Sequence, residues 1–220
     1  MRQGFFTREE VEELCAVCDC TQATIKARFW HQKKAAEHPE VTACWHLPPD
    51  LADMVSFLFW SAWRVGEARE LHWRDYDRME QAIRLRPEHS KNKHGRVLPV
   101  EGELATIIGR RWRARRLDCP YVFHRTGKRI RDFRKVWNRA CKAIGLEGRI
   151  VHDLRRSGVR HLIRAGVPPH TVMAMSGHRT ASMLKRYDII SLDDLRLAAR
   201  QGSDYTGQRS QVTPLRQRNP

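Results

Sequence analysis

A stretch near the end of the 220-residue chain contains side chains suited to the chemistry of a phosphate ester. His152 and Arg155 form a His-x-x-Arg pair. His178 follows a glycine, and Tyr187 comes nine residues after that histidine. An arginine offers a rigid fork of donors that matches two phosphate oxygens. A histidine can accept, donate or shuttle a proton near neutral pH, and a tyrosine hydroxyl can be a nucleophile. The stretch therefore holds groups that can bind a phosphate and attack it.

The charge of the chain points to an anionic partner. The formal net charge is +16 and the pI is about 10.3, while 41% of the residues are hydrophobic and can form a core. Such a basic balance favours a polyanion such as nucleic acid. Only Asp118 and Asp132 oppose the basic residues between positions 109 and 135, which indicates a surface that follows phosphates. These eleven basic residues are Arg110, Arg111, Arg113, Arg115, Arg116, Arg125, Lys128, Arg129, Arg131, Arg134 and Lys135.

The sequence gives no sign of export or membrane insertion. No apolar run reaches the roughly 18 residues needed to span a bilayer, and the first residues do not form a signal peptide. We therefore expect a cytoplasmic, nucleoid-associated protein whose six cysteines are reduced thiols. The helical spacing of the first cysteines favours core packing over metal binding. The alternative zinc ligands are Cys15, Cys18, Cys20, Cys44 and His46.

The elements that must position these groups are predicted to be mainly helices. Thr7 and Glu10 form a capping-box sequence, after which apolar spacing predicts a first helix to about residue 20. Residues 21–49 are an unusual connector. The apolar run after Asp50 has the length of a buried helix, and a short amphipathic helix follows it to about His72. Three short strands with turns between them are then predicted in WRDYDR, AIRLRP and GRVLPV.

Further helices are predicted over residues 101–117 and 131–144, with a short strand or extended link at 121–123. His152 and Arg155 then lie on one face of a helix, because residues three apart are neighbours there.

The chain's last elements are short. One helix is expected from about His170 to Ser176, another begins at Thr180 and carries Tyr187, and Ser191 caps a third. Residues 201–220 are predicted to be a disordered basic tail. The pattern predicts an α+β fold that is mainly α-helical, with a small three-stranded sheet.

Arg64 follows the buried helix, where a charge is costly without an anionic partner. Both a salt bridge to Glu67 and a role as a phosphate ligand account for it. The turn over residues 88–95 carries two lysines and two histidines, which are either solvated or reach into a DNA groove.

Four segments in the same order resemble the catalytic domain of the tyrosine recombinases, the phage-integrase family. WRVGEARELHWRDYD resembles its first arginine box, and KNKHGRVLPV its lysine hairpin. HDLRRSGVRHLIRAG resembles the second box, and SGHRTASMLKRYD the segment from histidine to tyrosine. Trp63 and Gly66 depart from the residues common at their positions. The resemblance implies the helical catalytic fold of this family, with a small antiparallel sheet, over residues 1–200.

The resemblance implies a role for each residue. Tyr187 would attack a DNA phosphate and form a 3′-phosphotyrosyl link. Arg64 and Arg155 would bind the non-bridging oxygens, with a further hydrogen bond from His178. His152 would assist the proton of the tyrosine, and no metal or other cofactor would be needed.

A lysine of the hairpin would protonate the departing 5′-oxygen. The spacing to the following Arg-x-x-Pro favours Lys91, with Lys93 as the alternative. Glu67 would support the arginines. The predicted DNA contacts are Lys93, Arg110, Arg113, Arg129 and Arg131.

The predicted partner is double-stranded DNA, bound by a homotetramer, with accessory DNA-bending proteins as further partners and no membrane contact. Without DNA the protein would be a monomer or weak oligomer. The family usually carries a helical DNA-gripping domain before the catalytic domain, and we expect it to be absent here: the chain would be a fragment, a naturally short member, or a protein whose second clamp half is supplied otherwise. Two other functions remain open at this stage: a type IB topoisomerase-like relaxing enzyme, and a DNA-binding protein with a relic site.

Overall fold

The structure is a computed structural model that describes residues 4–15, 47–90 and 94–185, together with residues 195, 196, 199, 200 and 203. The chain divides into a unit over Met1–Tyr187 and another over Asp188–Pro220, and every element named below belongs to the first. The helices are α1 (Arg8–Cys15), α3 (Pro49–Ser61), α4 (Val65–Arg69), α5 (Glu103–Arg113), α6 (Arg134–Ala143), α7 (Val151–Arg164), α8 (Pro169–Ser176) and α9 (Ala181–Lys185). The 3-10 turns and strands are η2 (Trp73–Asp75), η3 (Pro87–His89), β1 (Tyr76–Asp77), β2 (Ala82–Leu85), β3 (Arg96–Pro99), β4 (His124–Arg125) and β5 (Lys128–Arg129).

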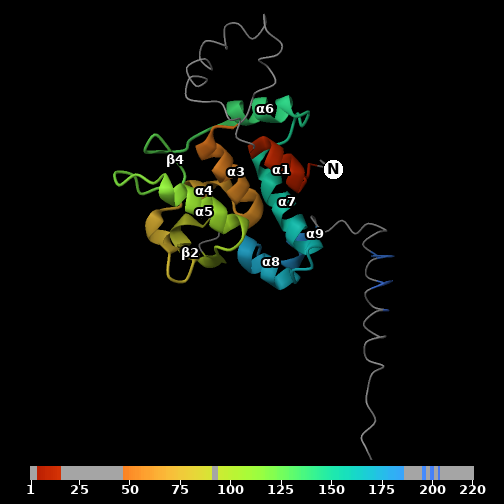
Figure 1. The fold of residues 1–220 in the computed structure, drawn as a ribbon. Coiled ribbons are helices and arrows are strands. Elements are labelled where there is room, and N and C mark those ends of the chain that lie inside the picture. Colours follow the sequence, from red (N-terminus) through yellow and green to blue (C-terminus); the bar gives the residue numbers. More distant parts are fainter. Residues whose placement is uncertain are drawn as a thin grey trace, which may run out of the picture. The chain divides into compact units, whose positions relative to one another are not determined.

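Helix α3 is the centre of the unit. It packs against α1, α5 and α7, and Figure 1 shows these helices gathered around it. Its sequence is mostly apolar, and residues such as Met54, Phe57 and Leu58 are fully buried. A helix that is hydrophobic all round is a buried one. The prediction of a buried helix after Asp50 is therefore confirmed, and its last turn leads directly to Arg64.

The predicted three-stranded sheet is confirmed as an antiparallel sheet of order β1-β2-β3. Ile83 of β2 is opposite Leu98 of β3, and both side chains are fully buried. Strand β3 also contacts α8, the helix that precedes His178. The sheet thus lies next to the segment that carries the Gly-His pair.

Helix α7 comes unusually close to α3. A Cβ atom at Gly158 would overlap the carbonyl oxygen of Phe59, so only glycine allows this approach. The contact fixes the helix that carries Arg155 against the helix that ends before Arg64. Helix α8 begins with a proline and ends at Gly177, whose φ of 74° is in the left-handed region that favours glycine.

Some predicted boundaries are wrong for identifiable reasons. Helix α5 ends at Arg113 and not near residue 117, because the residues beyond it are exposed, Leu117 completely, and packing does not extend the helix. Helix α6 begins at Arg134 and not at residue 131. The carboxylate of Asp132 accepts a hydrogen bond from the main-chain N–H of Arg134 at 3.0 Å, as in an Asx turn that leads into the helix.

The strand pair β4–β5 was not predicted. Its turn residues Thr126 and Gly127 have φ of 52° and 81°, the positive values of a tight two-residue hairpin. The expected link at 121–123 forms only an isolated bridge between Tyr121 and His72. The expected strand WRDYDR is half wrong, since Trp73–Asp75 is a 3-10 turn and only Tyr76–Asp77 is strand.

Other predictions lie outside the described residues. These are the end of the first helix beyond Cys15, the connector as far as residue 46, and three of the cysteines, Cys18, Cys20 and Cys44. Of the helix after Ser191 and the tail, the structure describes residues 195, 196, 199, 200 and 203, which are helical. In the described part of the chain no helix is both long and apolar enough to cross a membrane.

Candidate active site

Arg64 and Glu67 lie together at the start of α4. The Nη1 atom of Arg64 donates to Oε1 of Glu67 at 3.0 Å, and the main-chain N–H of Arg64 donates to Oε2 at 2.9 Å. Glu67 is buried with 2% of its side chain exposed, whereas 21% of the Arg64 side chain is exposed. The salt bridge considered from the sequence is therefore present, and the arginine still reaches solvent beside it.

Arg155 is buried in α7, with 3% of its surface exposed. Its Nη1 atom donates to the carbonyl oxygens of Ala62 at 2.6 Å and Ser176 at 2.7 Å. Ala62 ends α3 in the left-handed region at φ 53°, an uncommon conformation for a residue other than glycine. Arg155 thus ties the end of α3 to the end of α8, and these two ends carry Arg64 and His178.

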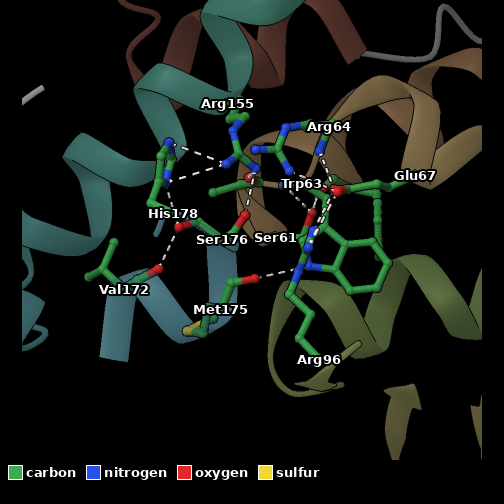
Figure 2. A network of polar contacts seen from close by, with 12 residues as sticks. Ser61, Trp63, Arg64, Glu67, Arg96, Arg155, Val172, Met175, Ser176 and His178 are labelled. Atoms are coloured by element: carbon green, nitrogen blue, oxygen red, sulfur yellow. Dashed lines mark hydrogen bonds and ion pairs between the residues drawn. The ribbon is translucent and has the colours of Figure 1, made fainter. Parts of the chain in front are cut away.

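His178 contacts Arg155 on one side and Ser176 on the other (Figure 2). Its Nε2 atom lies 3.2 Å from Nη2 of Arg155, and its Nδ1 atom lies 2.7 Å from Oγ of Ser176. The Ser176 hydroxyl has one proton and a second acceptor, the carbonyl of Val172 at 2.6 Å. When this proton points to Val172, Nδ1 of His178 carries the ring proton. When it points to Nδ1, Nε2 carries the proton and can donate to an anion.

The two histidines of the site are held in their neutral forms. Burial, and then the charges of Arg155 and Arg64, lower the pKa of His178 to about 3. The pKa of His152 is lowered by partial desolvation and then by the charge of Arg155, although its side chain is exposed. A neutral imidazole can accept a proton, which is what the expected role of His152 requires.

His152 faces a hollow of about 560 Å³ that also includes Val65, Arg69, Phe133 and Trp137. The charges that act on the pKa of His152 include those of Arg155 and, more weakly, Arg64, so the three side chains lie in one electrostatic neighbourhood. The hollow gives an incoming ligand access to the histidine.

Arg96 is a member of this site that the sequence did not reveal. It begins β3, its side chain is 8% exposed, and its guanidinium forms an ion pair with Glu67. A signal was present, because side chains two apart on a strand share one face. Leu98 and Val100 are buried on that face, which places the arginine inside as well.

The site contains more positive than negative charge. The labelled residues of Figure 2 include three arginines, one carboxylate and one neutral histidine: Arg64 and Arg96 pair with Glu67, and Arg155 lies beside His178. The three arginines come from the start of α4, from β3 and from α7. Buried guanidinium groups gathered in this way suit a phosphate, whose oxygens they can bind in pairs.

Three predicted site residues, Lys91, Lys93 and Tyr187, lie outside the described residues. The predicted DNA contacts Arg113, Arg129 and Arg131 are exposed on other elements, and Arg129 forms an ion pair with Glu70.

Two arginines of α5 differ from what the basic stretch suggested. Arg110 pairs with Asp53 at 2.8 Å. Arg111 is 5% exposed, so it does not belong to a surface that follows phosphates. Asp118 and Asp132 are the acidic residues within the basic stretch, and the fold adds Asp53 and Glu70 from distant parts of the sequence as further partners.

Cys15 packs in the interior, with its thiol 3.4 Å from the carbonyl of Ala52, and burial raises the pKa of this thiol to about 11. Among the residues that the structure describes, no cluster of three or more metal-ligating side chains occurs. The other four residues of the zinc alternative are outside them.

The fold is that of known recombinases. A crystal structure of XerA recombinase superposes with a TM-score of 0.60 at 19% identity, covering 90% of this chain and 64% of that chain. A lambda integrase tetramer bound to a Holliday junction superposes with a TM-score of 0.59 at 16% identity, covering 86% and 51%. At these identities the likeness establishes the fold.

Sequence comparison adds the family. Residues 5–191 match the Phage integrase family, so the chain belongs to it. The integrase of Salmonella phage P22 is 23% identical over 163 residues, which are 69% of this chain and 42% of that protein. The chain thus spans less than half of the length of this relative.

Proposed function

We propose that the protein cuts and rejoins DNA strands at defined sites, with Tyr187 as the nucleophile. The observation that supports this most strongly is the convergence of Arg64, Arg155 and His178 from three separate segments, with an excess of positive charge. A pentavalent phosphate carries its negative charge on the non-bridging oxygens, and preorganised donors at that position stabilise it. The family membership of the chain supports the same reaction.

In the proposed reaction the hydroxyl oxygen of Tyr187 attacks the phosphorus and the bond to the 5′-oxygen breaks. The tyrosine proton passes to neutral His152, and the 5′-oxygen takes a proton from the hairpin lysine, Lys91 or Lys93. The product is a 3′-phosphotyrosyl link and a free 5′-hydroxyl. Because one ester replaces another, the reverse attack by a 5′-hydroxyl rejoins the strand without ATP.

His178 is proposed to donate from Nε2 to a non-bridging oxygen. It can do so in its neutral form when the Ser176 hydroxyl donates to Nδ1, 2.7 Å away. Arg155 lies 3.2 Å from the same Nε2, so an arriving phosphate would be met by both side chains. For this tautomer the Ser176 hydroxyl, which donates to the carbonyl of Val172 at 2.6 Å, would turn to donate to Nδ1 instead.

The path of the DNA is proposed to follow two adjoining hollows. The hollow beside His152 shares Asp132 and Phe133 with a second hollow of about 880 Å³, which Arg129 and Arg131 help to line. Its basic lining suits a phosphate backbone. The proposed partner is duplex DNA held by a tetramer, as lambda integrase forms on a Holliday junction.

The test uses a pool of nicked DNA duplexes of random sequence, in which the short strand beyond the cut diffuses away and prevents rejoining. The wild-type chain is expected to give a covalent adduct on a denaturing gel, and Tyr187→Phe to give none. Tyr205→Phe is the matched control and should form the adduct as the wild type does.

Two outcomes would change the proposal. If neither the wild type nor Tyr187→Phe gives an adduct while both bind DNA equally, the protein is a DNA-binding module. If the wild type relaxes supercoiled plasmid as a monomer and never exchanges strands between duplexes, it is a relaxing enzyme of the type IB kind.

A further inference from the structure

Arg96 lies where three segments of the site meet. Its guanidinium carbon is 4.7 Å from the centre of the Trp63 ring, and it forms an ion pair with Glu67. A Cβ atom on Gly177 would come within 2.6 Å of its Nη1 atom. Figure 2 shows it reaching Glu67 from beside the Trp63 ring. Arg96 thus connects the strand that follows the lysine hairpin with the first arginine box and the Gly-His segment.

The carboxylate of Glu67 is shared by two arginines. Burial alone would raise its pKa, but the hydrogen bonds and charge of Arg96, together with Arg64, outweigh burial and lower the pKa of Glu67. Glu67 is therefore ionised, and Arg96 neutralises much of its charge. Without Arg96, the whole carboxylate charge would act on Arg64. The Arg64 guanidinium would then be drawn toward Glu67 and away from a phosphate.

Stability alone does not explain a buried ion pair at this position. A buried pair is often no more stabilising than apolar side chains of similar size, because both ions lose their hydration. Strand β3 is already held by the buried side chain of Leu98 and by its pairing with β2. The charge of Arg96 therefore has its main effect on the neighbouring charges.

We propose that Arg96 is a positioning residue for strand cleavage: by neutralising Glu67, it leaves the guanidinium of Arg64 available to the scissile phosphate. This rests on the proposed cleavage reaction. In this proposal Arg96 acts through Glu67 and Arg64 and not by contact with the DNA. Its effect therefore belongs to the chemical step and not to DNA binding.

The first experiment measures single-turnover cleavage of a nicked duplex selected from the random pool by its covalent adduct. Arg96→Met should cut about 100-fold slower, the scale of a small misplacement of a catalytic group. Its dissociation constant for the duplex should change by less than about threefold, since phosphate contacts along the backbone dominate affinity. Arg96→Lys retains the charge and should recover a large part of the rate.

Arg111→Met is the matched control for the loss of a buried arginine. The Arg111 side chain is 6% exposed, compared with 8% for Arg96, and its partners are Asp53 and the carbonyl of Val122. Arg111→Met should cut at nearly the wild-type rate. Thermal unfolding of both variants checks that they are folded to a similar extent.

The second experiment tests the charge argument directly. If Arg96 acts by neutralising Glu67, then Glu67→Gln removes the need for it. The double variant Arg96→Met with Glu67→Gln should cut at least about tenfold faster than Arg96→Met alone. An interaction energy of this size between two substitutions is typical of charged residues in contact. A purely structural role predicts a double variant that is slower than either single variant.

The third experiment removes the charge from the substrate. The selected duplex is remade with a methylphosphonate at the cleaved position, which replaces one charged oxygen by a methyl group. In the stereoisomer whose methyl group replaces the oxygen that Arg64 binds, the rates of wild type and Arg96→Met should approach each other to within about threefold, because Arg64 then has lost its oxygen partner.

The outcomes separate this inference from the function on which it rests. If the wild type forms no adduct, the proposed function fails and Arg96 is not at issue. If the wild type forms the adduct but Arg96→Met cuts like Arg111→Met, or keeps its full deficit in both Glu67→Gln and methylphosphonate experiments, Arg96 is not a positioning residue.

Discussion

Two regions of the molecule are rich in arginine, and they use it differently. In the site, Arg64, Arg96 and Arg155 are buried or half-buried and converge on one carboxylate, two main-chain carbonyls and a neutral histidine. On the surface around α5, β5 and α6, arginines pair singly with acidic residues. The surface pairs are Arg110–Asp53, Arg116–Asp118, Arg129–Glu70 and Arg134–Asp132.

The difference shows which arginines are prepared for a ligand. An exposed ion pair contributes little to stability and exchanges readily with solvent. Arg134 lowers the pKa of exposed Asp132 to about 2, yet such a pair can open whenever DNA approaches. In the site, in contrast, the guanidinium groups are held by buried partners before any ligand arrives. Sequence counts of basic residues do not distinguish these two situations.

The largest effect is expected from Arg155→Met. The change removes a guanidinium from the proposed phosphate site, where loss of one donor costs about 10²–10³-fold in rate. It also leaves the carbonyls of Ala62 and Ser176 without this buried donor, which should lower the free energy of unfolding by about 2–4 kcal/mol. Covalent adduct formation and urea unfolding measure the two effects.

Arg110→Met is the surface control. If it lost as much activity or stability as Arg155→Met, the arginines of the site would not differ from surface arginines in the way proposed here.

Glycines provide a second test of the same contrast. Gly158→Ala places a Cβ against the carbonyl of Phe59 where α7 meets α3, and should destabilise the fold by about 3 kcal/mol. Gly109→Ala in α5 has no neighbour within 4 Å and should stabilise it by about 0.5–1 kcal/mol through helix propensity. Thermal unfolding of both variants measures this. Equal changes in stability for Gly158→Ala and Gly109→Ala would mean that the contact between α7 and α3 is packed no more tightly than the surface of α5.

The contacts that make this site were only partly predictable. Motifs local in sequence were found correctly: the helix with His152 and Arg155, the end of α8 at Gly177, and the pairing of Arg64 with Glu67. The hydrogen-bond partners of Arg155 could not be predicted, because Ala62 is 93 residues away in the sequence and contributes only its main-chain carbonyl.

Trp63 shows the same limit. From the sequence it was only a departure from the family pattern. In the structure its ring faces the guanidinium of Arg96, and its Nε1 atom donates to the carbonyl of Met175 at 3.1 Å. A contact between residues 112 positions apart has no local signal in a single sequence.

His178 allows a test by pH. Its pKa is about 3 in the folded chain, compared with the ordinary value of 6.5, so the unfolded chain binds more protons between these values. Above pH 6.5 the residue is neutral in both states and does not change the free energy of unfolding. As the pH falls below 6.5, the unfolded chain takes up the proton and the free energy of unfolding decreases. From pH 7 to pH 5 this residue should account for a loss of about 2 kcal/mol in unfolding free energy.

The measurement is urea unfolding of the wild type and His178→Gln at both pH values. The variant should lose less stability between them by that amount, because glutamine does not titrate. Parallel losses in the two proteins would show that His178 is not held neutral by its surroundings.

The smallest effects are expected on the surface. Arg131→Gln removes an exposed charge that lines the basic hollow, and should reduce the slope of DNA affinity against salt by about one counterion. Arg110→Gln removes an arginine already paired with Asp53 and should change the slope less. Its effect on stability should exceed that of an exposed ion pair, because the carboxylate of Asp53 is buried, with 12% of its side chain exposed, and loses one of its two arginine partners. Binding to a fixed duplex from 50 to 200 mM salt gives both slopes. A larger change in the salt slope for Arg110→Gln than for Arg131→Gln would show that DNA binds Arg110 although this arginine is paired in the free protein. An ion pair in the free protein would then not predict which surface arginines stay away from DNA.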